Sequence, residues 1–232
     1  MQYTHTHKGV SKMVEVENLD VYSLKGKLVR HKEKKATHEE MRKEYYEKGK
    51  ITTMHKHVGV LLANSKGRVI LQRRSKWKGD NAGLWDKTIG GHVQAGEDFD
   101  LTLLKECAQE LGIPATIVKE EEFQRAAETT NLHILAIVKK LGMVDNFQSK
   151  RLGPDGKAWV EPNISVFYIG YYDGTIWFID AESCGLQVFT IDELKEEMKK
   201  NPGAFTEDVK YMMQKWGHLI KPVEKKPQAI SD

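Results

Sequence analysis

The sequence has few cysteines and no long apolar run. Its two cysteines, Cys107 and Cys184, lie far apart in the chain and do not form a short-spaced metal or redox pair. Two free thiols are typical of a protein from a reducing compartment. No apolar run approaches the roughly 18 residues that a membrane-spanning helix needs, and the N-terminal segment MQYTHTHKGVSK lacks the apolar core of a secretory signal. We therefore expect a soluble, cytoplasmic protein with no membrane partner.

The chain also lacks a strong excess of either charge. Its 36 Lys and Arg against 33 Asp and Glu give a net charge of +3 and a pI of about 8.6. A surface that binds polynucleotides usually carries a larger basic excess, so nucleic acid is not indicated as a partner. With 40% hydrophobic and 30% charged residues, the composition is that of a globular protein, and the length suits one sizeable domain with extensions.

The order of apolar and polar stretches predicts an α/β (α+β) fold with a mixed sheet between helices. Strand pairs are predicted at residues 14–29, 57–73 and 164–179, and one further strand at residues 132–138. Helices are predicted at residues 37–49, 190–200 and 206–216, the first two opened by Thr-x-x-Glu capping boxes. The polar residues 142–160 are predicted to form a loop that turns at residues 153–156.

These elements divide the chain into three expected parts. Residues 1–50 form an N-terminal extension, a hairpin plus a charged helix whose charges we assign to the surface, packed on the main domain. Residues 51–221 form the main domain, and residues 222–232 form a polar tail that we expect to be disordered. The extension could pair two subunits, so a homodimer is one expected assembly.

The stretch from residue 91 to residue 113, GHVQAGEDFDLTLLKECAQELGI, concentrates the chemistry. It predicts a helix whose buried stripe is Leu101, Leu104, Ala108 and Leu111. Glu106 and Glu110 lie four residues apart on the other side, with Gln109 beside them. Mg²⁺ prefers carboxylates, water and substrate phosphates as ligands, so this side predicts a Mg²⁺ site, with Mn²⁺ as an alternative. The glycines at 90, 91 and 96 would let backbone groups approach metal and phosphate closely.

The spacing of this stretch, Gly91-x5-Glu97-x7-Lys105-Glu106-x2-Gln109-Glu110-x-Gly112-Ile113, resembles the Nudix box, Gly-x5-Glu-x7-Arg-Glu-U-x-Glu-Glu-x-Gly-U, where U is a bulky apolar residue. The resemblance implies an α/β/α sandwich with a mixed sheet, in which the box forms a loop–helix–loop. It implies Mg²⁺-dependent hydrolysis of a diphosphate linkage in a nucleoside diphosphate derivative. The catalytic and metal-binding residues that it implies are Glu106, Glu110 and Gln109, with Gly90 at the metal and with Glu97 and Lys105 fixing the loop.

Two positions depart from the box. Lys105 replaces the family arginine, which keeps the charge and loses the planar fork that clamps a carboxylate. Gln109 replaces a glutamate, which removes one negative charge and leaves an amide oxygen as a weaker Mg²⁺ ligand. Three explanations stay open for Gln109: a natural variant that binds fewer metals, an engineered inactivating change, or an adapted activity.

Residues 18–112 resemble the Nudix branch that includes isopentenyl-diphosphate isomerase, through His55, Arg73-Arg74 and Gly83-Leu84-Trp85. The isomerase uses a cysteine two residues before a metal-binding histidine and the later glutamate of a Glu-x-Glu pair. His92 and Glu161 match this pattern, but Gly90 stands at the cysteine position and Asn163 at the second glutamate. The resemblance therefore favours a hydrolase over an isomerase, and a nucleotide-binding protein of low activity is the third alternative. His55, His92 and Glu161 are either a remnant of the isomerase metal site or ordinary hydrogen-bonded side chains.

Further candidates lie outside the box. An additional carboxylate, as metal ligand or catalytic base, would come from Glu161, Glu182 or the run at residues 120–122. Arg73 and Arg74 are candidates for binding substrate phosphates, because arginine pairs with phosphate through two hydrogen bonds. The aromatic residues that could stack on a base are Trp77, Trp85, Phe123, Trp159, Tyr168 and Trp177.

Overall fold

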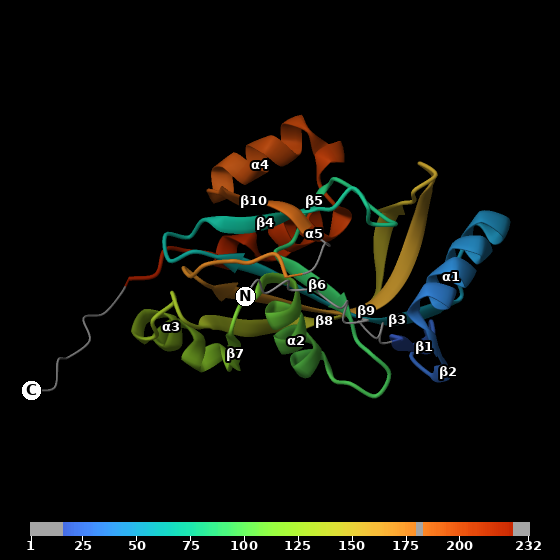
Figure 1. Cartoon of the computed structure of the whole chain (residues 1–232), viewed down its shortest axis with the longest axis horizontal. Helices are drawn as coiled ribbons and strands as arrows, with labels where there is room; N and C mark the ends of the chain where they lie inside the picture. The colour runs from blue at the N-terminus through green and yellow to red at the C-terminus, as the bar shows by residue number, and fades with distance from the viewer. Residues whose placement is uncertain (1–15, 180–182, 225–232) are drawn as a thin grey trace, which may run out of the picture.

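The computed structural model describes residues 16–179 and 183–224 and shows a mixed sheet with helices on both faces (Figure 1). The strands are β1 (Asn18–Ser23), β2 (Leu28–Glu33), β3 (Thr53–Ala63), β4 (Val69–Arg74), β5 (Trp85–Asp86), β6 (Ile89–His92), β7 (Ala115–Val118), β8 (Ala136–Leu152), β9 (Ala158–Tyr171) and β10 (Ser183–Phe189). The helices are α1 (Lys34–Lys48), α2 (Phe99–Leu111), α3 (Glu120–Thr129), α4 (Ile191–Lys200) and α5 (Glu207–Trp216), with the 3-10 turns η1 (Pro202–Ala204) and η2 (Gly217–Leu219). The predicted α/β sandwich is confirmed.

The strand order across the main sheet is β10-β4-β3-β9-β8-β7. β3 runs parallel to β9, and β7 runs parallel to β8, whereas the other neighbours in this order are antiparallel. β6 pairs with the middle of β3, so that Gly59 lies opposite Gly90 and His57 lies opposite His92. This pairing brings the middle of β3 and the beginning of the residue 91–113 stretch to one place.

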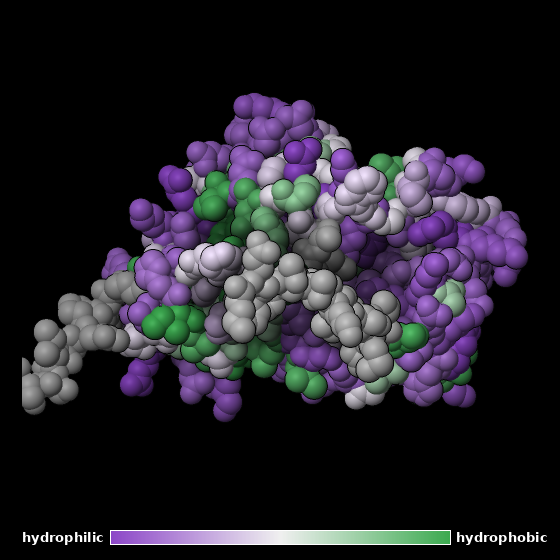
Figure 2. All heavy atoms as spheres, in the orientation of Figure 1, coloured by the Kyte–Doolittle hydropathy of each residue, from purple (hydrophilic) through white to green (hydrophobic). Residues whose placement is uncertain are grey.

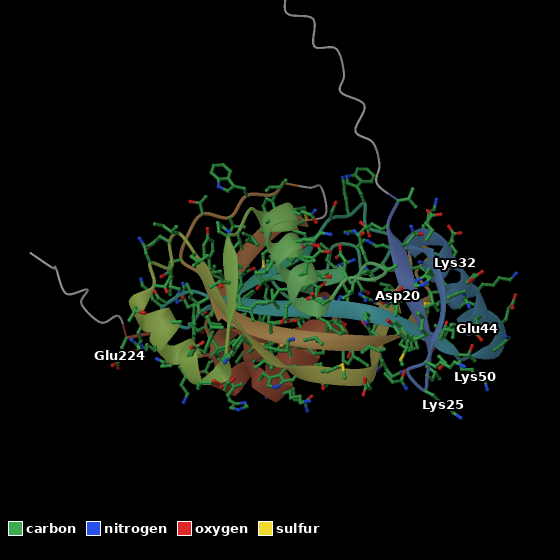
Figure 3. All side chains as sticks on the ribbon, turned by 90° about the horizontal axis from the view of Figure 1, so that it is seen from below. Asp20, Lys25, Lys32, Glu44, Lys50 and Glu224 are labelled. Carbon is green, nitrogen blue, oxygen red and sulfur yellow. The ribbon has the colours of Figure 1, made fainter. Side chains whose placement is uncertain are left out.

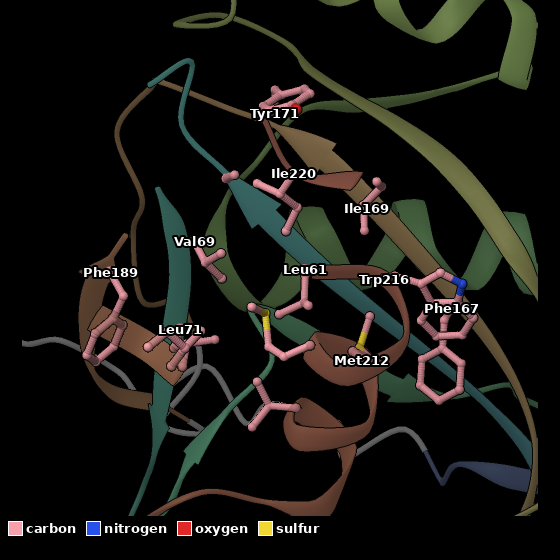
Figure 4. Close-up of a cluster of buried hydrophobic side chains, with 14 of the residues drawn as sticks. Leu61, Val69, Leu71, Phe167, Ile169, Tyr171, Phe189, Met212, Trp216 and Ile220 are labelled. Carbon is pink, nitrogen blue, oxygen red and sulfur yellow. The ribbon is translucent and has the colours of Figure 1, made fainter. Parts of the chain in front are cut away.

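Side chains alternate between the two faces of the sheet along each strand, and each face is covered by a buried core. Leu61, Val69 and Phe167 face α5 and belong to the core drawn in Figure 4, where Met212 and Trp216 come from the helical side. Residues at even positions of β3, such as Val60 and Leu62, face α2 on the opposite side. A strand that is buried on both faces contributes apolar side chains to both cores, which explains the nearly continuous apolar run of β3.

The N-terminal segment lies at one end of the sheet. β1 and β2 form the predicted hairpin, and β1 also pairs with the start of β3. Figure 3 shows this hairpin and α1 grouped at that end, where Asp20, Lys32 and Glu44 are labelled. The predicted capping box at Thr37 was wrong: α1 already begins at Lys34, and Thr37 is a buried residue of its first turn whose hydroxyl donates to the Glu33 carbonyl.

Residues 142–160 form two long paired strands rather than the predicted loop. The pairing of β8 with β9 extends to Leu152 opposite Ala158, and only the turn at residues 153–156 was predicted correctly. The prediction failed because the inward side chains here are largely polar. Ser149 and Arg151 are buried, and both bond to buried carboxylates.

The predicted strand at residues 175–179 was also wrong. This segment runs along the C-terminal end of α2, where Trp177 N donates to the Leu111 carbonyl and Ile179 N donates to the Glu110 carbonyl. The last carbonyls of a helix have no partner within it. The segment therefore bonds to the end of α2 instead of pairing with β9.

The C-terminal helices agree with the sequence prediction. α4 opens with the complete Thr190–Glu193 capping box, and α5 is capped by the Thr206 side chain. Beyond them, Val223 is buried and its N–H donates to the Ser65 carbonyl, so the packed chain reaches the start of the expected tail. Residues 225–232 lie outside the described structure. None of the helices in residues 16–179 and 183–224 combines the length and apolarity that crossing a membrane requires.

Candidate functional site

A cavity of about 440 Å³ opens between α1, β6, α2 and the β8–β9 strand pair. All of the described residues that line it are charged, polar or glycine. Figure 2 shows predominantly hydrophilic side chains over the end of the molecule that carries α1. A cavity of this composition suits an ionic ligand and differs from the mostly apolar pockets that bind drug-like molecules.

The orientation of α2 differs from the prediction in a way that defines the site. Its buried stripe contains Leu103, Cys107 and Leu111, whereas Leu101 is 48% exposed and only Leu111 belongs to the predicted stripe. The helix is therefore rotated, and Glu110 becomes a buried residue. Cys107 packs as a small apolar side chain against the sheet, and burial raises the pKa of its thiol to about 12. A buried thiol that stays protonated at neutral pH is a poor nucleophile.

Glu106 and Glu110 both line the cavity, and Glu106 packs directly on the backbone of Gly91. A Cβ atom at Gly91 would lie 2.0 Å from Glu106 Oε1, so only glycine leaves room for this carboxylate. Glu110 is 4% exposed, and Gln109 is exposed beside it at the cavity. Two carboxylates of one helix in a polar cavity, one of them packed on a glycine backbone, are a donor set that fits Mg²⁺.

The loop before α2 is tied to the helix through Glu97. Lys105 Nζ lies 2.5 Å from Glu97 Oε1, and the Thr102 hydroxyl donates to Glu97 Oε2 at 3.3 Å. Asp98 caps the helix by accepting a hydrogen bond from Leu101 N. Lysine thus makes a contact with Glu97 that joins loop and helix, through one nitrogen in place of the fork of an arginine.

A second group of ligating side chains lies at the cavity, where His38, His92 and Glu161 line it and His55 is buried beside them. His38, His55, His92 and Glu161 each offer an atom within 4.8 Å of one another. The Nε2 atoms of the three histidines are buried and make no hydrogen bond of good geometry within the described residues. Glu161 Oε1 lies 3.3 Å from His38 Nε2 and 3.4 Å from His55 Nε2. Three imidazole nitrogens and a carboxylate oxygen within 4.8 Å of one another fit a divalent transition metal.

The protonation states suit this interpretation. Burial lowers the pKa of His38 to about 4 and the pKa of His92 well below its ordinary value, so both rings are neutral at pH 7. Burial opposes ionisation of Glu161, but the Arg151 guanidinium holds the pKa of this carboxyl well below its usual range. Neutral imidazole and ionised carboxylate are the forms that bind a metal.

Arg151 and Asn163 position Glu161. Arg151 donates from Nε and Nη2 to Glu161 Oε2, at 3.0 and 2.6 Å, which leaves Oε1 facing the histidines. The Asn163 amide donates to the Glu161 carbonyl at 3.3 Å. An isomerase would carry its second glutamate at position 163. In this chain Asn163 stands there and donates a hydrogen bond to Glu161, the first residue of the pair.

Gly90 leaves room for a buried lysine. The Lys87 side chain passes between Gly59 and Gly90, and a Cβ atom at Gly90 would lie 2.3 Å from Lys87 Cε. Lys87 Nζ lies 2.9 Å from Asp208 Oδ2 and 3.3 Å from Asp86 Oδ1. The structure therefore gives a physical reason for glycine at the position of the isomerase cysteine: a larger residue would displace a buried ion pair.

We expect acid to destabilise the fold through its buried histidines. Burial lowers the pKa of His57 to about 3 and that of His38 to about 4, whereas both rings protonate in the unfolded chain below about pH 6.5. Unfolding therefore takes up protons, and the free energy of unfolding falls by about 2 kcal/mol for each of these histidines between pH 7.5 and 5. Urea unfolding at the two pH values measures this loss. His57→Gln should remove about 2 kcal/mol of it, and an unchanged pH dependence in that variant would contradict the assignment.

The other predicted site residues lie in different places. Arg74 lines the cavity and pairs with Asp86, whereas Arg73 lies outside the lining, stacks over Trp85 and donates to the Gly83 carbonyl. The carboxylates at residues 120–122 begin α3 and are not among the described lining residues. Glu182 lies outside the described structure. None of the six aromatic candidates is among the described lining residues, and Phe123, Trp159 and Tyr168 are core residues.

The sequence analysis missed His38 and the contribution of α1. α1 supplies Lys34, Lys35, His38 and Arg42 to the cavity, although its charges were assigned to the surface. A usable signal existed, because the two buried residues of α1, Thr37 and Met41, are uncharged and lie on the same side of the helix as His38. That spacing indicates the side of α1 that faces the domain.

A protein-family model described as the NUDIX domain matches residues 53–209. The chain is 41% identical over 61 residues to an uncharacterised Nudix hydrolase, PA4841, of Pseudomonas aeruginosa, covering 26% of this chain and 36% of that protein. It is 36% identical over 77 residues to isopentenyl-diphosphate Delta-isomerase of Nocardia farcinica, covering 33% of this chain and 44% of that protein. The chain thus spans less than half the length of these two relatives.

A longer and weaker similarity joins the chain to isopentenyl-diphosphate Delta-isomerase of Serratia proteamaculans, at 24% identity over 153 residues, 66% of this chain and 71% of that protein. Among solved structures, DR0079 from Deinococcus radiodurans superposes with a TM-score of 0.58 at 17% identity, covering 85% of this chain and 98% of that chain. At this identity the structural likeness supports the fold alone.

Proposed function

The chain belongs to the Nudix family, and on that premise we propose that it hydrolyses a diphosphate linkage in a nucleoside diphosphate derivative with the help of Mg²⁺. The observation that carries the proposal is the placement of Glu106 and Glu110 together in a polar cavity, one of them packed on the Gly91 backbone. Cytoplasmic localisation and a homodimer are further predictions for the same protein.

Each residue of the site has a different role in the proposed reaction. Glu106 and Glu110 would hold Mg²⁺ or Mn²⁺, with Gln109 and the Gly90 backbone beside them. When bound, the cation supplies neutralisation of the diphosphate charge and a more acidic water. Arg74, which lines the cavity, would bind a phosphate, and the Lys105–Glu97 pair would keep the loop against the helix. Water attacks phosphorus, and the anhydride P–O bond breaks.

Gln109 sets the charge of this site. Because the side chain is exposed on α2, a glutamate at this position would fit without repacking. The Gln109→Glu substitution would restore one negative charge and tighten the hold on Mg²⁺. If Gln109 inactivates the enzyme, only the Gln109→Glu variant should hydrolyse substrate. If Gln109 is a natural adaptation, both the native chain and the Gln109→Glu variant should do so.

Isomerisation of isopentenyl diphosphate is the rival activity, because several relatives carry that name. It requires a positioned acid and base, and the structure has Gly90 and Asn163 at the two family positions. The Lys87 side chain fills the space that a cysteine at residue 90 would need. These observations favour hydrolysis.

A substrate panel tests the proposal. Nucleoside di- and triphosphates, nucleotide sugars, dinucleotides and isopentenyl diphosphate would be incubated with Mg²⁺ or Mn²⁺ and with either the native chain or Gln109→Glu. We expect phosphate or nucleotide release from at least one nucleotide substrate and no conversion of isopentenyl diphosphate. Release from none of them by either protein would defeat the hydrolase proposal, and conversion of isopentenyl diphosphate would support the isomerase.

Gly91→Ala should lower kcat by about 100-fold, the size of effect that a 1 Å displacement of a catalytic group produces. The new Cβ would lie 2.0 Å from Glu106 Oε1 and 2.2 Å from Glu106 Cδ, so the carboxylate must move. The atoms displaced are the end of a flexible side chain, so we expect the protein to stay folded. Gly79→Ala is the matched control, since Gly79 also lines the cavity and its Cβ would meet no atom within 4 Å. Equal kcat values for the two variants would show that the packing of Glu106 on the Gly91 backbone is not needed for catalysis.

A further inference from the structure

We propose that the β1–β2 hairpin holds the loop of residues 93–98, between β6 and α2, in its catalytic position, with Asp20 as the positioning residue. The inference rests on the proposed function, because it takes the carboxylates of α2 as ligands of the catalytic metal. It assigns a role to a segment outside the family match, since the NUDIX model begins at residue 53 and β2 ends at Glu33. Asp20 lies in β1, at the end of the sheet where Figure 3 shows the hairpin.

The backbone of this loop is bound to β1. Ala95 N donates a hydrogen bond to the Asn18 carbonyl at 2.7 Å, and Leu19 forms an isolated antiparallel bridge with Gln94. Connecting segments are usually more mobile than the elements that they join. Pairing with a strand therefore restrains this loop at its middle.

Asp20 extends the pairing with its side chain. The residue is 8% exposed, and Gly96 N donates to its Oδ2 atom at 3.3 Å. The same carboxylate accepts a hydrogen bond from the Tyr22 hydroxyl at 3.2 Å, and its Oδ1 atom lies 2.6 Å from His31 Nδ1. Burial raises the pKa of Asp20, but the contacts with Gly96 and His31 outweigh burial and hold this pKa below its ordinary value. The carboxylate is therefore ionised at neutral pH, and a hydrogen bond to an ionised acceptor is about twice as strong as one between neutral groups.

Gly96 makes the turn of this loop. Its φ of 79° lies in the left-handed region, which glycine adopts at no steric cost. Glycine also loses more conformational freedom on folding than any other residue, so a loop that turns at glycine is costly to keep in one conformation. The hydrogen bond to Asp20 offsets this cost and fixes the turn.

The turn at Gly96 determines where Glu97 lies. Glu97 follows it directly, lines the cavity, and places its Oε1 atom 2.5 Å from Lys105 Nζ of α2. Lys105 in turn precedes Glu106, one of the two α2 carboxylates. Asp20 thus acts on the metal site through the loop. Loss of a partner that orients a metal site from outside typically costs about 10–100-fold in metal affinity or activity.

The test is the metal dependence of Asp20→Ala. With the best nucleotide of the substrate panel, we expect kcat to fall by about 10-fold and the Mg²⁺ concentration for half of the maximal rate to rise by about 10-fold. KM for the nucleotide should change by less than about 3-fold, because the residues that line the cavity are unchanged. Asp20→Asn should recover kcat to within about 3-fold of the native value, since its amide oxygen can still accept the Gly96 hydrogen bond. Native kcat and native metal dependence in Asp20→Ala would overturn the inference.

Val21→Ala separates positioning from stability. Val21 is fully buried in the same strand, and alternation along β1 directs its side chain to the face opposite that of Asp20. The substitution leaves a cavity and should lower the midpoint of thermal unfolding, as Asp20→Ala should. Below both midpoints, only Asp20→Ala should change the Mg²⁺ requirement. Equal changes in the two variants would show that the hairpin contributes stability alone.

Two measurements do not depend on turnover. Hydrogen exchange at residues 94–97, followed by mass spectrometry, should be about 10-fold faster in Asp20→Ala than in the native chain or Val21→Ala, the effect of losing one hydrogen bond to a charged group. Calorimetric titration with Mg²⁺ alone should show about 10-fold weaker binding in Asp20→Ala. If no nucleotide is hydrolysed and both shifts are found, the proposed function fails and the inference about the loop stands. If hydrolysis occurs and neither shift is found, the inference fails and the proposed function stands.

Discussion

Replacing Glu110 by glutamine is expected to lower kcat for diphosphate hydrolysis by about 1,000-fold or more, the typical effect of removing a group that stabilises the transition-state charge. Glu110 is 4% exposed, lines the cavity and comes from the same side of α2 as Glu106. Glutamine has nearly the same shape, so the change removes a charge and leaves the packing of α2 in place. Steady-state kinetics over a range of Mg²⁺ concentrations measures the loss, and the midpoint of thermal unfolding reports whether the fold is kept.

Glu121→Gln is the matched control for this experiment. Glu121 is an exposed carboxylate in the first turn of α3 and is not among the described lining residues. Its variant should retain the native kcat. If Glu110→Gln and Glu121→Gln are equally active, the α2 carboxylates do not bind the catalytic metal.

The second large effect is expected at the histidine cluster. We predict that the protein binds one equivalent of Mn²⁺ or Zn²⁺ at His38, His55, His92 and Glu161, in addition to the metal of the α2 site. His92→Ala should weaken this binding by about 100-fold or more, because a direct ligand contributes at least as much as the outer partners whose loss costs about 10–100-fold. Titration calorimetry and metal analysis after dialysis measure affinity and stoichiometry.

His133→Ala controls for a nonspecific loss of histidine, since His133 is exposed and does not belong to the cluster. It should bind the metal as the native chain does. Arg151→Lys is informative as well, because lysine cannot make both hydrogen bonds to Glu161 Oε2 and should release the carboxylate from its orientation. Native affinity in His92→Ala would show that the metal does not bind at this cluster.

The parts of the fold that the sequence predicted are those determined by local chemistry. The Thr190–Glu193 box predicts the start of α4 because both hydrogen bonds form within four residues. Gly112 ends α2 in the left-handed conformation, with φ of 62°, for an equally local reason. The Gly91–Ile113 spacing predicts the proposed α2 site for the same reason, because Glu97, Glu106 and Glu110 all belong to one loop and the helix that directly follows it.

The parts that were missed depend on contacts between distant segments. Ser149 and Arg151 look like loop residues until their partners Asp208 and Glu161 are known, because a buried polar side chain is stable only when it is bonded. His38 joins His55 and His92 only because α1 packs at the end of the sheet where β3 and β6 meet. The rotation of α2 was missed since Thr102 and Cys107 are less apolar than Leu101 and Leu104, although they face the sheet.

Hydrolysis in water enriched in ¹⁸O tests the central claim most directly. The native chain and Gln109→Glu would be incubated with Mg²⁺ and a nucleoside triphosphate, and the products would be examined by mass spectrometry. We predict that cleavage places one ¹⁸O atom in a phosphate-containing product, that Glu110→Gln forms no product above background, and that chelation of the metal stops the reaction. Cleavage that persists in Glu110→Gln, or the absence of any labelled product from both the native chain and Gln109→Glu with Mg²⁺ and with Mn²⁺, would contradict a metal-dependent hydrolase built on α2.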